Sequence, residues 1–374
     1  MKLLLLVDEN MTRARSIKKN FDRFEKRINP GNVFEEVHIV DTPLRYSGIT
    51  ELGPKTYLYS TKRLFGMGYI TVIFKIAAII KKEKIGIIKI NYSKFLGLLA
   101  IFFQWASGIP CVAGCYNDYR SWRKYFPFDR IFVNLFLEKF VYRHARFVLY
   151  QSQFMMNYLQ ALGVRRERFK LCYVMNTDVD NFLNVRHSVD PQFFTLVFCG
   201  RLHNQKDVWT LLKAYKILKE ARFDARLWLI GDGPLRLKLE AFVKDNAIKD
   251  VIFYGFLENS AIASLYAQAD LFVFTTLFEG FPNVLIEAQA AGLPIVTTDI
   301  PHVSEIVSSN DAYLFKVKNH LELSGILNRL YRNEPELSRL RQASRKRSEE
   351  FLKKDIPGTN SKAYRDIYSE SREK

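Results

Sequence analysis

The chain has 374 residues and a mass of 43.7 kDa, more than one ordinary hydrophobic core accommodates, so two domains are expected. Because 48% of the residues are hydrophobic and 25% are charged, the composition is that of folded domains and excludes a disordered chain. The formal net charge is +17; residues 1–185 hold 29 Lys and Arg against 15 Asp and Glu, and the remainder holds 27 against 24. An anionic partner is therefore expected to meet the amino-terminal half.

The opening segment and the cysteines exclude further classes. Residues 1–7 reach Asp8 after five apolar residues, too few for a signal-peptide core, and predict a first buried strand. The cysteines lack the spacing of a zinc site and are too few for a disulfide scaffold, which favours buried thiols in a reducing cytoplasm. They are Cys111, Cys115, Cys172 and Cys199. No uninterrupted apolar run approaches the ~20 residues that cross a bilayer, so we expect a protein that is cytoplasmic or touches a membrane from one side.

Short apolar runs alternate with longer amphipathic runs, which predicts βαβ units around parallel sheets. In chain order, the predicted strands of the first half are Leu3–Val7, Glu36–Val40, Ile85–Ile90, Pro110–Cys115 and Phe147–Tyr150. Those of the second half are Phe194–Cys199, Arg226–Ile230, Val251–Tyr254, Leu271–Thr275 and Pro294–Thr298. The clearest helices lie at Val208–Lys219, Leu235–Asp245, Ser260–Gln268 and Asn283–Ala291. The predicted fold class is therefore α/β, with two Rossmann-like parallel-sheet domains.

The domain boundary is placed where the pattern fades. Around Asn181–Pro191 polar residues and a proline interrupt it, so the expected domains are residues 1–185 and 186–355. A charged helix is predicted at Leu337–Lys354, followed by a break at Pro357 and Gly358 and a short amphipathic piece at Ala363–Ser369. Residues 356–374 are expected either to return to the first domain as a helix or to form an exposed tail.

The second domain offers a candidate anion site. Gly200 and Arg201 lie at the carboxyl end of a strand, where open α/β sheets bind ligands, and Lys206 precedes the next helix. An arginine is a two-pronged donor and a lysine a point charge, so both can converge on one anion; two solvated surface cations are the alternative. The next strand ends in Gly231-Asp-Gly-Pro234, which lacks the third glycine of the dinucleotide fingerprint and disfavours a hydride-transfer enzyme. The turn at Phe256 could offer backbone groups to a flat ring.

Residues 271–294 carry the strongest signal. The amides near Asn283 and Val284 open a predicted helix and have no intrahelical acceptors, so with the helix dipole they form an anion site. Glu279 lies just before these amides and Glu287 further down the helix, so the two carboxylates can face opposite ends of a ligand whose phosphates occupy the helix start. A surface loop acid is the alternative for Glu279, whereas burial of Glu287 would require a partner.

Glu279 and Glu287, separated by seven residues, resemble the paired-glutamate (Glu-x7-Glu) motif of the large retaining group of GT-B glycosyltransferases. Further motifs match the same family in the same order: Gly-Arg-Leu at 200–202 followed by Lys206, Gly-Asp-Gly-Pro at 231–234, and Pro-His-Val-Ser-Glu-Ile-Val at 301–307. The resemblance covers roughly residues 194–307. It implies a GT-B fold, in which two Rossmann-like domains face each other across a cleft that is the active site.

The resemblance also implies roles for the residues of the donor site. Arg201, Lys206 and Glu279 would be catalytic, the two cations holding the donor's diphosphate and Glu279 contacting the transferred sugar. Glu287 would hydrogen-bond the ribose, and Phe256 would flank the base. The implied donor-binding residues together are Gly200, Arg201, Lys206, Phe256, Glu279, Phe281, Asn283, Val284 and Glu287. Asp207 departs from the family pattern, which has glycine after the lysine.

The resemblance is thinner before residue 190. The glycine-rich turn expected after the first strand is replaced by Glu9-Asn-Met-Thr-Arg-Ala-Arg15, and the histidine often found after the fourth or fifth strand is not evident. Cys115-Tyr-Asn-Asp118 occupies that neighbourhood, so Asn117 and Asp118 are the acceptor-side candidates for contact with the reacting sugar. A turn built on Asn-Asp is the alternative.

Two segments of the first half combine basic and aromatic residues, and a third between them is apolar and aromatic. The two basic segments are Lys62–Lys94 and Tyr119–Phe147, and the apolar one is Phe95–Trp105. Aromatic side chains beside Lys and Arg are typical of interfacial helices, which favours an anionic membrane surface as partner; core helices with a wet basic face are the alternative. Nucleic acid is not expected, because no reader module or stacking motif accompanies the charge.

Together these observations predict an enzyme that moves a sugar from a nucleotide-diphosphate sugar to a saccharide or lipid-linked saccharide acceptor. The resemblance implies retention of configuration, and we expect a role in polysaccharide or lipopolysaccharide biosynthesis at the cytoplasmic face of the cell membrane. No metal and no cofactor beyond the nucleotide-sugar co-substrate is expected, since Arg201, Lys206 and the helix amides supply the positive charge. The alternatives are a GT-B epimerase or phosphorylase, and a non-catalytic nucleotide-sugar-binding protein.

Overall fold

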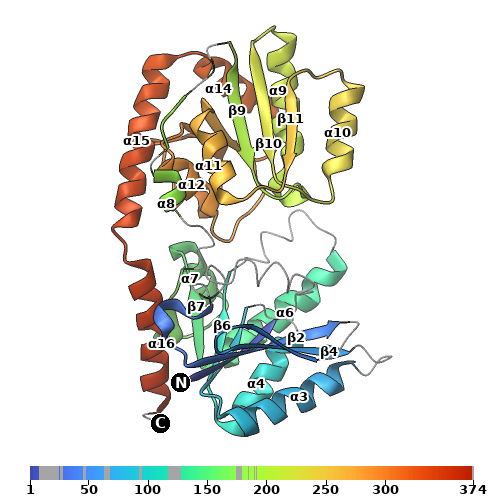
Figure 1. Cartoon of the computed structure of the whole chain (residues 1–374), viewed down its shortest axis with the longest axis vertical. Helices are drawn as coiled ribbons and strands as arrows, with labels where there is room; N and C mark the ends of the chain where they lie inside the picture. Colours follow the sequence, from blue (N-terminus) through green and yellow to red (C-terminus); the bar gives the residue numbers. More distant parts are fainter. Residues whose placement is uncertain are drawn as a thin grey trace. The chain divides into compact units, whose positions relative to one another are not determined.

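The chain divides into two compact units, and each is described by itself. Unit 1 is Met1–Asn176 with Asp355–Lys374, and unit 2 is Thr177–Lys354 (Figure 1). The computed structural model describes residues 1–7, 25, 28–44, 48–62, 68–91, 95–116, 128–173, 179–183, 185–188, 190 and 192–372. The side chains of 42–44, 61–62, 68–69 and 128–135 lie outside this description, as do Asn117 and Asp118.

Unit 1 is built on a sheet in the order β3-β4-β2-β1-β5-β6-β7-β8, parallel throughout except that β3 pairs antiparallel with β4. The strands are β1 (Lys2–Val7), β2 (Glu36–Leu44), β3 (Gly48–Gly53), β4 (Thr56–Lys62), β5 (Ile87–Ile90), β6 (Cys111–Gly114), β7 (Phe147–Tyr150) and β8 (Phe169–Leu171). The helices are α3 (Gly68–Glu83), α4 (Phe95–Ser107), α6 (Phe128–His144), α7 (Gln153–Ala161) and α16 (Ile356–Arg372), with short 3-10 turns η1 (Pro30–Asn32) and η2 (Arg166–Arg168).

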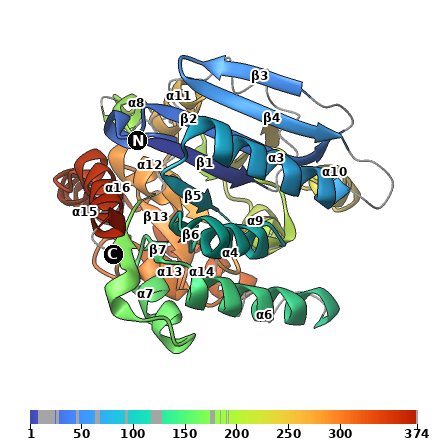
Figure 2. The same ribbon diagram turned by 90° about the horizontal axis from the view of Figure 1, so that it is seen from below.

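Both faces of this sheet are buried, which explains why its central strands are continuously apolar rather than alternating. Leu4 and Leu6 of β1 face a core that includes residues of α3, α4, α6 and α7. Leu3 and Leu5 face the opposite core, to which α16 contributes Tyr364. Figures 1 and 2 show α3 and α4 together along one side of this sheet.

Helix α16 is anchored to unit 1 by polar contacts as well as by its apolar face. The Asn360 side chain exchanges two hydrogen bonds of 2.8 Å with the backbone of Tyr173, and Ser361 Oγ donates to the carbonyl of Pro30 at 2.9 Å. Pro357 occupies the first turn of α16, where its missing amide hydrogen costs nothing, so the helix begins there rather than breaking as predicted.

Unit 2 has a six-stranded parallel sheet in the order β11-β10-β9-β12-β13-β14. Its strands are β9 (Phe194–Cys199), β10 (Ala225–Ile230), β11 (Val251–Gly255), β12 (Leu271–Phe274), β13 (Ile295–Thr298) and β14 (Tyr313–Phe315). Its helices are α8 (Asp180–Leu183), α9 (Val208–Glu220), α10 (Arg236–Asp245), α11 (Asn259–Ala267), α12 (Asn283–Ala290), α13 (Pro301–Ser304), α14 (His320–Leu330) and α15 (Glu334–Leu352), and η3 is a 3-10 turn at Asn204–Lys206. The predicted α/β class with two Rossmann-like parallel sheets is confirmed.

The domain boundary was expected at residue 185. The first segment of unit 1 instead ends at Asn176, and α8 belongs to unit 2. The physical reason is packing, because the Phe182 ring lies 5.5 Å from that of Tyr266 in α11, centroid to centroid.

Replacing Tyr364 by Ala should destabilise unit 1 by about 3 kcal/mol, since a fully buried ring that packs edge-on against Phe34 would leave a cavity. Urea unfolding followed by circular dichroism measures the change. Arg365→Ala on the exposed side of α16 is the matched control and should leave the midpoint unchanged. Equal midpoints for both variants would show that α16 does not stabilise unit 1.

Candidate functional site

The candidate site lies where the strand order of the unit 2 sheet reverses. From β9 the chain moves outward to β10 and β11 on one side, and then returns to place β12 on the other side of β9. The carboxyl ends of β9 and β12 therefore form a switch point, and such a switch point is where open parallel sheets bind ligands. The predicted residues Arg201 and Lys206 follow β9, and Glu279 follows β12.

Hydrogen bonds join these two loops directly. The amide of Leu277 donates to the carbonyl of Gln205 at 2.8 Å, and the Gln205 side-chain amide donates to the carbonyl of Phe278 at 2.9 Å. Thr275 Oγ1 donates to the carbonyl of Lys206 at 2.9 Å. The backbone on both sides is thus fixed, so the side chains that project from it are preorganised.

Lys206 and Glu279 form a buried ion pair at the centre of this region. Lys206 Nζ lies 2.6 Å from Glu279 Oε1, with the two side chains 16% and 7% exposed. The same carboxylate oxygen accepts a hydrogen bond from Thr276 Oγ1 at 2.6 Å, and the ammonium lies 4.9 Å from the centroid of the Phe274 ring. The two residues predicted to act together are therefore in contact, each holding the other in place.

Arg201 provides the accessible positive charge. Its side chain is exposed, and among the described residues no group accepts a hydrogen bond from its guanidinium. Burial lowers the pKa of neighbouring His203, and repulsion from Arg201 lowers it further, so this imidazole is neutral at pH 7. Arg201 is thus free to bind an anion that enters the site.

Glu287 lies close to the Cys199 thiol at the carboxyl end of β9, and therefore on the same edge of the sheet. Burial and the nearby charge of Glu287 together raise the pKa of Cys199 to about 12, against the hydrogen bond with Tyr266 and the charge of Lys206, which lower it. Both charged groups are therefore close enough to act on one thiol. Glu287 itself is buried in α12, 6% exposed, so the second predicted carboxylate also belongs to this region.

Glycines bring the neighbouring loops together. Gly231 has φ +125°, and a Cβ built there would lie 2.1 Å from the carbonyl oxygen of Gly200. A Cβ on Gly233 would lie 2.4 Å from the carbonyl oxygen of Leu202, whose amide donates to Asp232 at 3.0 Å. The Gly-Asp-Gly segment is therefore required for close packing of the loops after β9 and β10, which positions Arg201 indirectly.

The start of α12 differs in part from the expectation. The Asn283 amide donates to the carbonyl of Phe281 at 3.0 Å, so of the two predicted amides only that of Val284 lacks a backbone acceptor among the described residues. No side chain caps the helix at Pro282. The Phe281 ring lies 6.1 Å from that of Phe351, centroid to centroid, which indicates a packing role for this predicted donor-binding residue.

The remaining predicted residues lie further out or outside the description. Phe256, 77% exposed, follows β11, two strands and about 10 Å from the β9 loop. The acceptor-side candidates Asn117 and Asp118 lie outside the described residues. Sequence reasoning missed Thr276 and Gln205, since an ordinary loop threonine and glutamine carry no signal of the contacts they make.

Asp207, which replaces the family's glycine, adopts a glycine-like backbone. Its φ and ψ are both 43°, in the left-handed region, and its Oδ2 accepts a hydrogen bond from Thr210 Oγ1 at 2.8 Å. Burial raises the pKa of its carboxyl. The departure from the motif therefore preserves the chain path and leaves the Lys206 side chain paired with Glu279.

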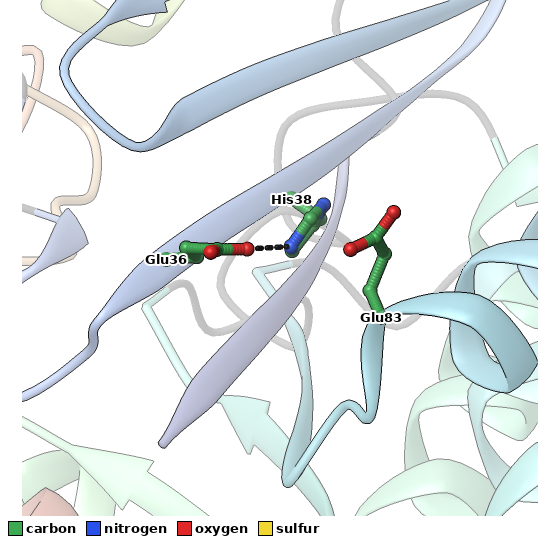
Figure 3. Close-up of side chains that lie close together, drawn as sticks. All are labelled: Glu36, His38 and Glu83. Atoms are coloured by element: carbon green, nitrogen blue, oxygen red, sulfur yellow. Dashed lines mark hydrogen bonds and ion pairs between the residues drawn. The ribbon is translucent and has the colours of Figure 1, made fainter.

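One group of described residues could share a metal ion, and it lies in unit 1. The donor atoms of Glu36, His38 and Glu83 lie within 4.8 Å of one another (Figure 3). The ammonium of Lys2 already lies 2.7 Å from the Glu36 carboxylate and 3.6 Å from that of Glu83. Since Lys2 and Glu36 open β1 and β2, this cluster fastens the amino edge of the sheet, opposite to the edge where ligands bind.

Variants that break the Lys206–Glu279 pair should show that the two side chains are energetically coupled. Lys206→Met or Glu279→Gln alone should each destabilise unit 2 by about 3 kcal/mol, because each leaves a buried charge without its partner. The double variant should lose about 1–3 kcal/mol less than the sum of the singles. Urea unfolding of the four proteins gives the coupling energy, and strictly additive losses would contradict a direct pair.

Asp207→Gly should be nearly neutral for stability. Relief of the left-handed backbone, about 1 kcal/mol, offsets loss of the hydrogen bond from Thr210, also about 1 kcal/mol. Asp207→Ala loses the bond without the relief, so it should lower the melting temperature in a thermal scan. The account of this position is wrong if the alanine variant is the more stable of the two.

Comparison with known proteins agrees with this geometry. Residues 181–347 match the family model described as glycosyl transferases group 1, and residues 36–173 match that of the glycosyl transferase 4-like domain. The putative glycosyltransferase EpsF of Bacillus subtilis is 42% identical over 101 residues, 27% of this chain and 26% of EpsF. The GDP-mannose-dependent alpha-(1-6)-phosphatidylinositol dimannoside mannosyltransferase of Mycobacterium tuberculosis is 32% identical over 167 residues, 44% of this chain and 42% of that enzyme. The matches thus span between about a quarter and two fifths of these curated relatives.

The fold has a solved counterpart as well. Anabaena HepE in complex with UDP and glucose superposes with a TM-score of 0.75 and 17% identity, covering 99% of this chain and 100% of that one. At this identity the likeness concerns the fold. Residues 181–347 thus match a group 1 glycosyltransferase domain and residues 36–173 a glycosyl transferase 4-like domain, and the chain has the GT-B fold of two Rossmann-like units.

Proposed function

We propose that this protein transfers a sugar from a nucleoside-diphosphate sugar to a saccharide or lipid-linked saccharide acceptor. The observation that supports it most is the pairing of Lys206 with Glu279 at the switch point of the sheet, on the loop that also carries the exposed Arg201. Two cations and a carboxylate in this arrangement suit a ligand that carries a diphosphate and a polyhydroxylated ring.

In the proposed reaction the bond between the anomeric carbon and the diphosphate oxygen breaks, and an acceptor hydroxyl bonds that carbon on the same face and passes its proton to the leaving diphosphate oxygen. The leaving diphosphate gains negative charge, which Arg201, Lys206 and the Val284 amide are proposed to stabilise. Glu279 orients the sugar, and Glu287 accepts from the ribose hydroxyls. Positive charge from the chain itself makes the transfer independent of a metal ion, with no further cofactor.

The proposed setting is the synthesis of cell-surface polysaccharide or lipopolysaccharide, with the protein peripheral to the cytoplasmic face of the membrane. Two observations support it: one relative's name specifies a phosphatidylinositol-based acceptor, and residues 1–185 hold most of the excess positive charge. In the part of the chain that the structure describes, no helix has the length and hydropathy needed to cross a bilayer.

The test measures nucleoside diphosphate release from UDP-, GDP- and ADP-sugars with chelator present, and anomeric configuration by NMR. One donor should turn over, and Arg201→Gln should lower the rate about 10²–10³-fold, because it removes one donor to the developing charge. The fold should survive, since the Arg201 side chain is exposed. Lys213→Gln, an exposed cation on α9, is the matched control and should retain full turnover.

Other outcomes would overturn the proposal in distinct ways. Binding of a donor without transfer or hydrolysis would indicate a nucleotide-sugar-binding protein. A product isomer formed without acceptor would indicate an epimerase, and consumption of inorganic phosphate a phosphorylase. Turnover in Arg201→Gln within twofold of the unmodified protein would refute the site.

A further inference from the structure

A cavity of about 670 Å³ lies at the amino edge of the unit 1 sheet, away from the edge where ligands of parallel sheets bind. Trp105 lines it from the carboxyl end of α4, and Arg143 from the carboxyl end of α6. Arg146 just before β7, and Arg165 and Arg168 around η2, complete its basic wall. These elements come from one unit, so the cavity stands independently of the candidate donor site.

Most of the positive charge in this cavity is not neutralised. The guanidinium of Arg168 donates to the carbonyls of Arg143 and Ala145, at 2.8 and 3.4 Å, and that of Arg146 to the carbonyl of Glu370 at 3.3 Å. Within the described residues no carboxylate bonds Arg143, Arg146 or Arg168. Two acids also line the cavity, but Glu370 is bound to Lys170 and Glu167 pairs with Arg165 in an exposed contact at 3.3 Å.

The arginines are close enough to repel one another. Burial lowers the pKa of Arg168, and the charges of Arg165 and Arg146 lower it further, against that of Glu167, which raises it. An anion bound among them would relieve this repulsion, and guanidinium groups suit a phosphate because they offer paired donors.

Exposed aromatic side chains adjoin the cavity. Trp105 is 62% exposed and packs edge-on against Phe140 and His144 of α6, with centroids 6.3 and 5.8 Å apart. Phe102 lies one turn before Trp105 on α4, and Phe136 one turn before Phe140 on α6; they are 55% and 67% exposed. Figure 2 shows α4 and α6 side by side. Water-facing aromatics beside arginines are typical of surfaces that lie in the headgroup region of a bilayer.

We propose that this cavity seats the phosphate of an anionic phospholipid headgroup, while Phe102, Trp105 and Phe136 enter the membrane interface. The proposal deepens the membrane association of the proposed function by naming the surface that docks. Binding through the amino edge leaves the carboxyl ends of the strands open, and β7 has four residues, so the two edges lie about 13 Å apart along it. A membrane-borne acceptor thus stays within reach of the unit.

The test is co-sedimentation with phosphatidylcholine vesicles, with and without phosphatidylglycerol. The unmodified protein should bind only the anionic vesicles, more weakly as salt rises. The double variant Arg143→Gln/Arg165→Gln should bind about tenfold more weakly, since each cation near an anionic leaflet adds to affinity. Lys213→Gln/Lys238→Gln in unit 2 removes the same charge from an exposed surface and should change binding less than twofold.

A second pair of variants tests the role of the exposed aromatic residues Phe102 and Phe136. Phe102→Ser/Phe136→Ser should weaken vesicle binding even at high salt, whereas Leu237→Ser, an exposed apolar residue of unit 2, should not. Inorganic phosphate distinguishes the source of the anion. If phosphate raises the melting temperature of the unmodified protein but not of Arg143→Gln/Arg165→Gln, and vesicles are not bound, the cavity serves a free phosphate and the lipid assignment is overturned.

Donor turnover, measured on the same proteins, separates this proposal from the proposed function. Arg143→Gln/Arg165→Gln should release nucleoside diphosphate at the unmodified rate, because these arginines lie outside the donor site. Vesicle binding without turnover in the unmodified protein would refute the transfer reaction and keep the docking surface. Equal vesicle binding by the arginine variant and the unmodified protein would refute the docking surface alone.

Discussion

The buried pair of Lys206 and Glu279 is the interaction on which the candidate site depends. Neither charge could stay in that position alone, since a buried ion without a partner is strongly disfavoured. The pair exists because β9 and β12 are neighbours in the sheet and the loops that follow them contact each other. Sheet order therefore brings together residues that lie 73 positions apart in the chain.

A division of roles follows from burial. Lys206 is held by the carboxylate, Phe274 and the loop hydrogen bonds, so its ammonium is fixed before a ligand arrives. Arg201 is exposed, which suits first contact with an anion from solution. Gly231 and Gly233 allow the loops after β9 and β10 to pack closely, since a Cβ at either position would collide with the backbone of the β9 loop. An entering diphosphate would therefore meet a site in which Glu279 already partly neutralises the charge of Lys206.

The apolar pattern predicted most strands and helices of both sheets, because parallel strands buried on two faces are uninterrupted runs. The hairpin of β3 and β4 was missed, since β3 is largely exposed and pairs antiparallel in a chain that otherwise indicates βαβ units. The motifs located Arg201, Lys206, Glu279 and Glu287, but spacing along the chain contains no information on which charges touch. The contact between Lys206 and Glu279, the hydrogen bond from Thr276 and the engaged amide of Asn283 emerge only in three dimensions.

A crystal structure of the protein with a bound nucleoside diphosphate would show whether the diphosphate occupies the candidate site. We expect the diphosphate oxygens to lie within hydrogen-bonding distance of the Arg201 guanidinium, the Lys206 ammonium and the Val284 amide. Glu279 would remain beside Lys206 with its second oxygen facing the space for the sugar. A diphosphate bound elsewhere, with Arg201 in solvent and Lys206 bonded only to Glu279, would contradict the account.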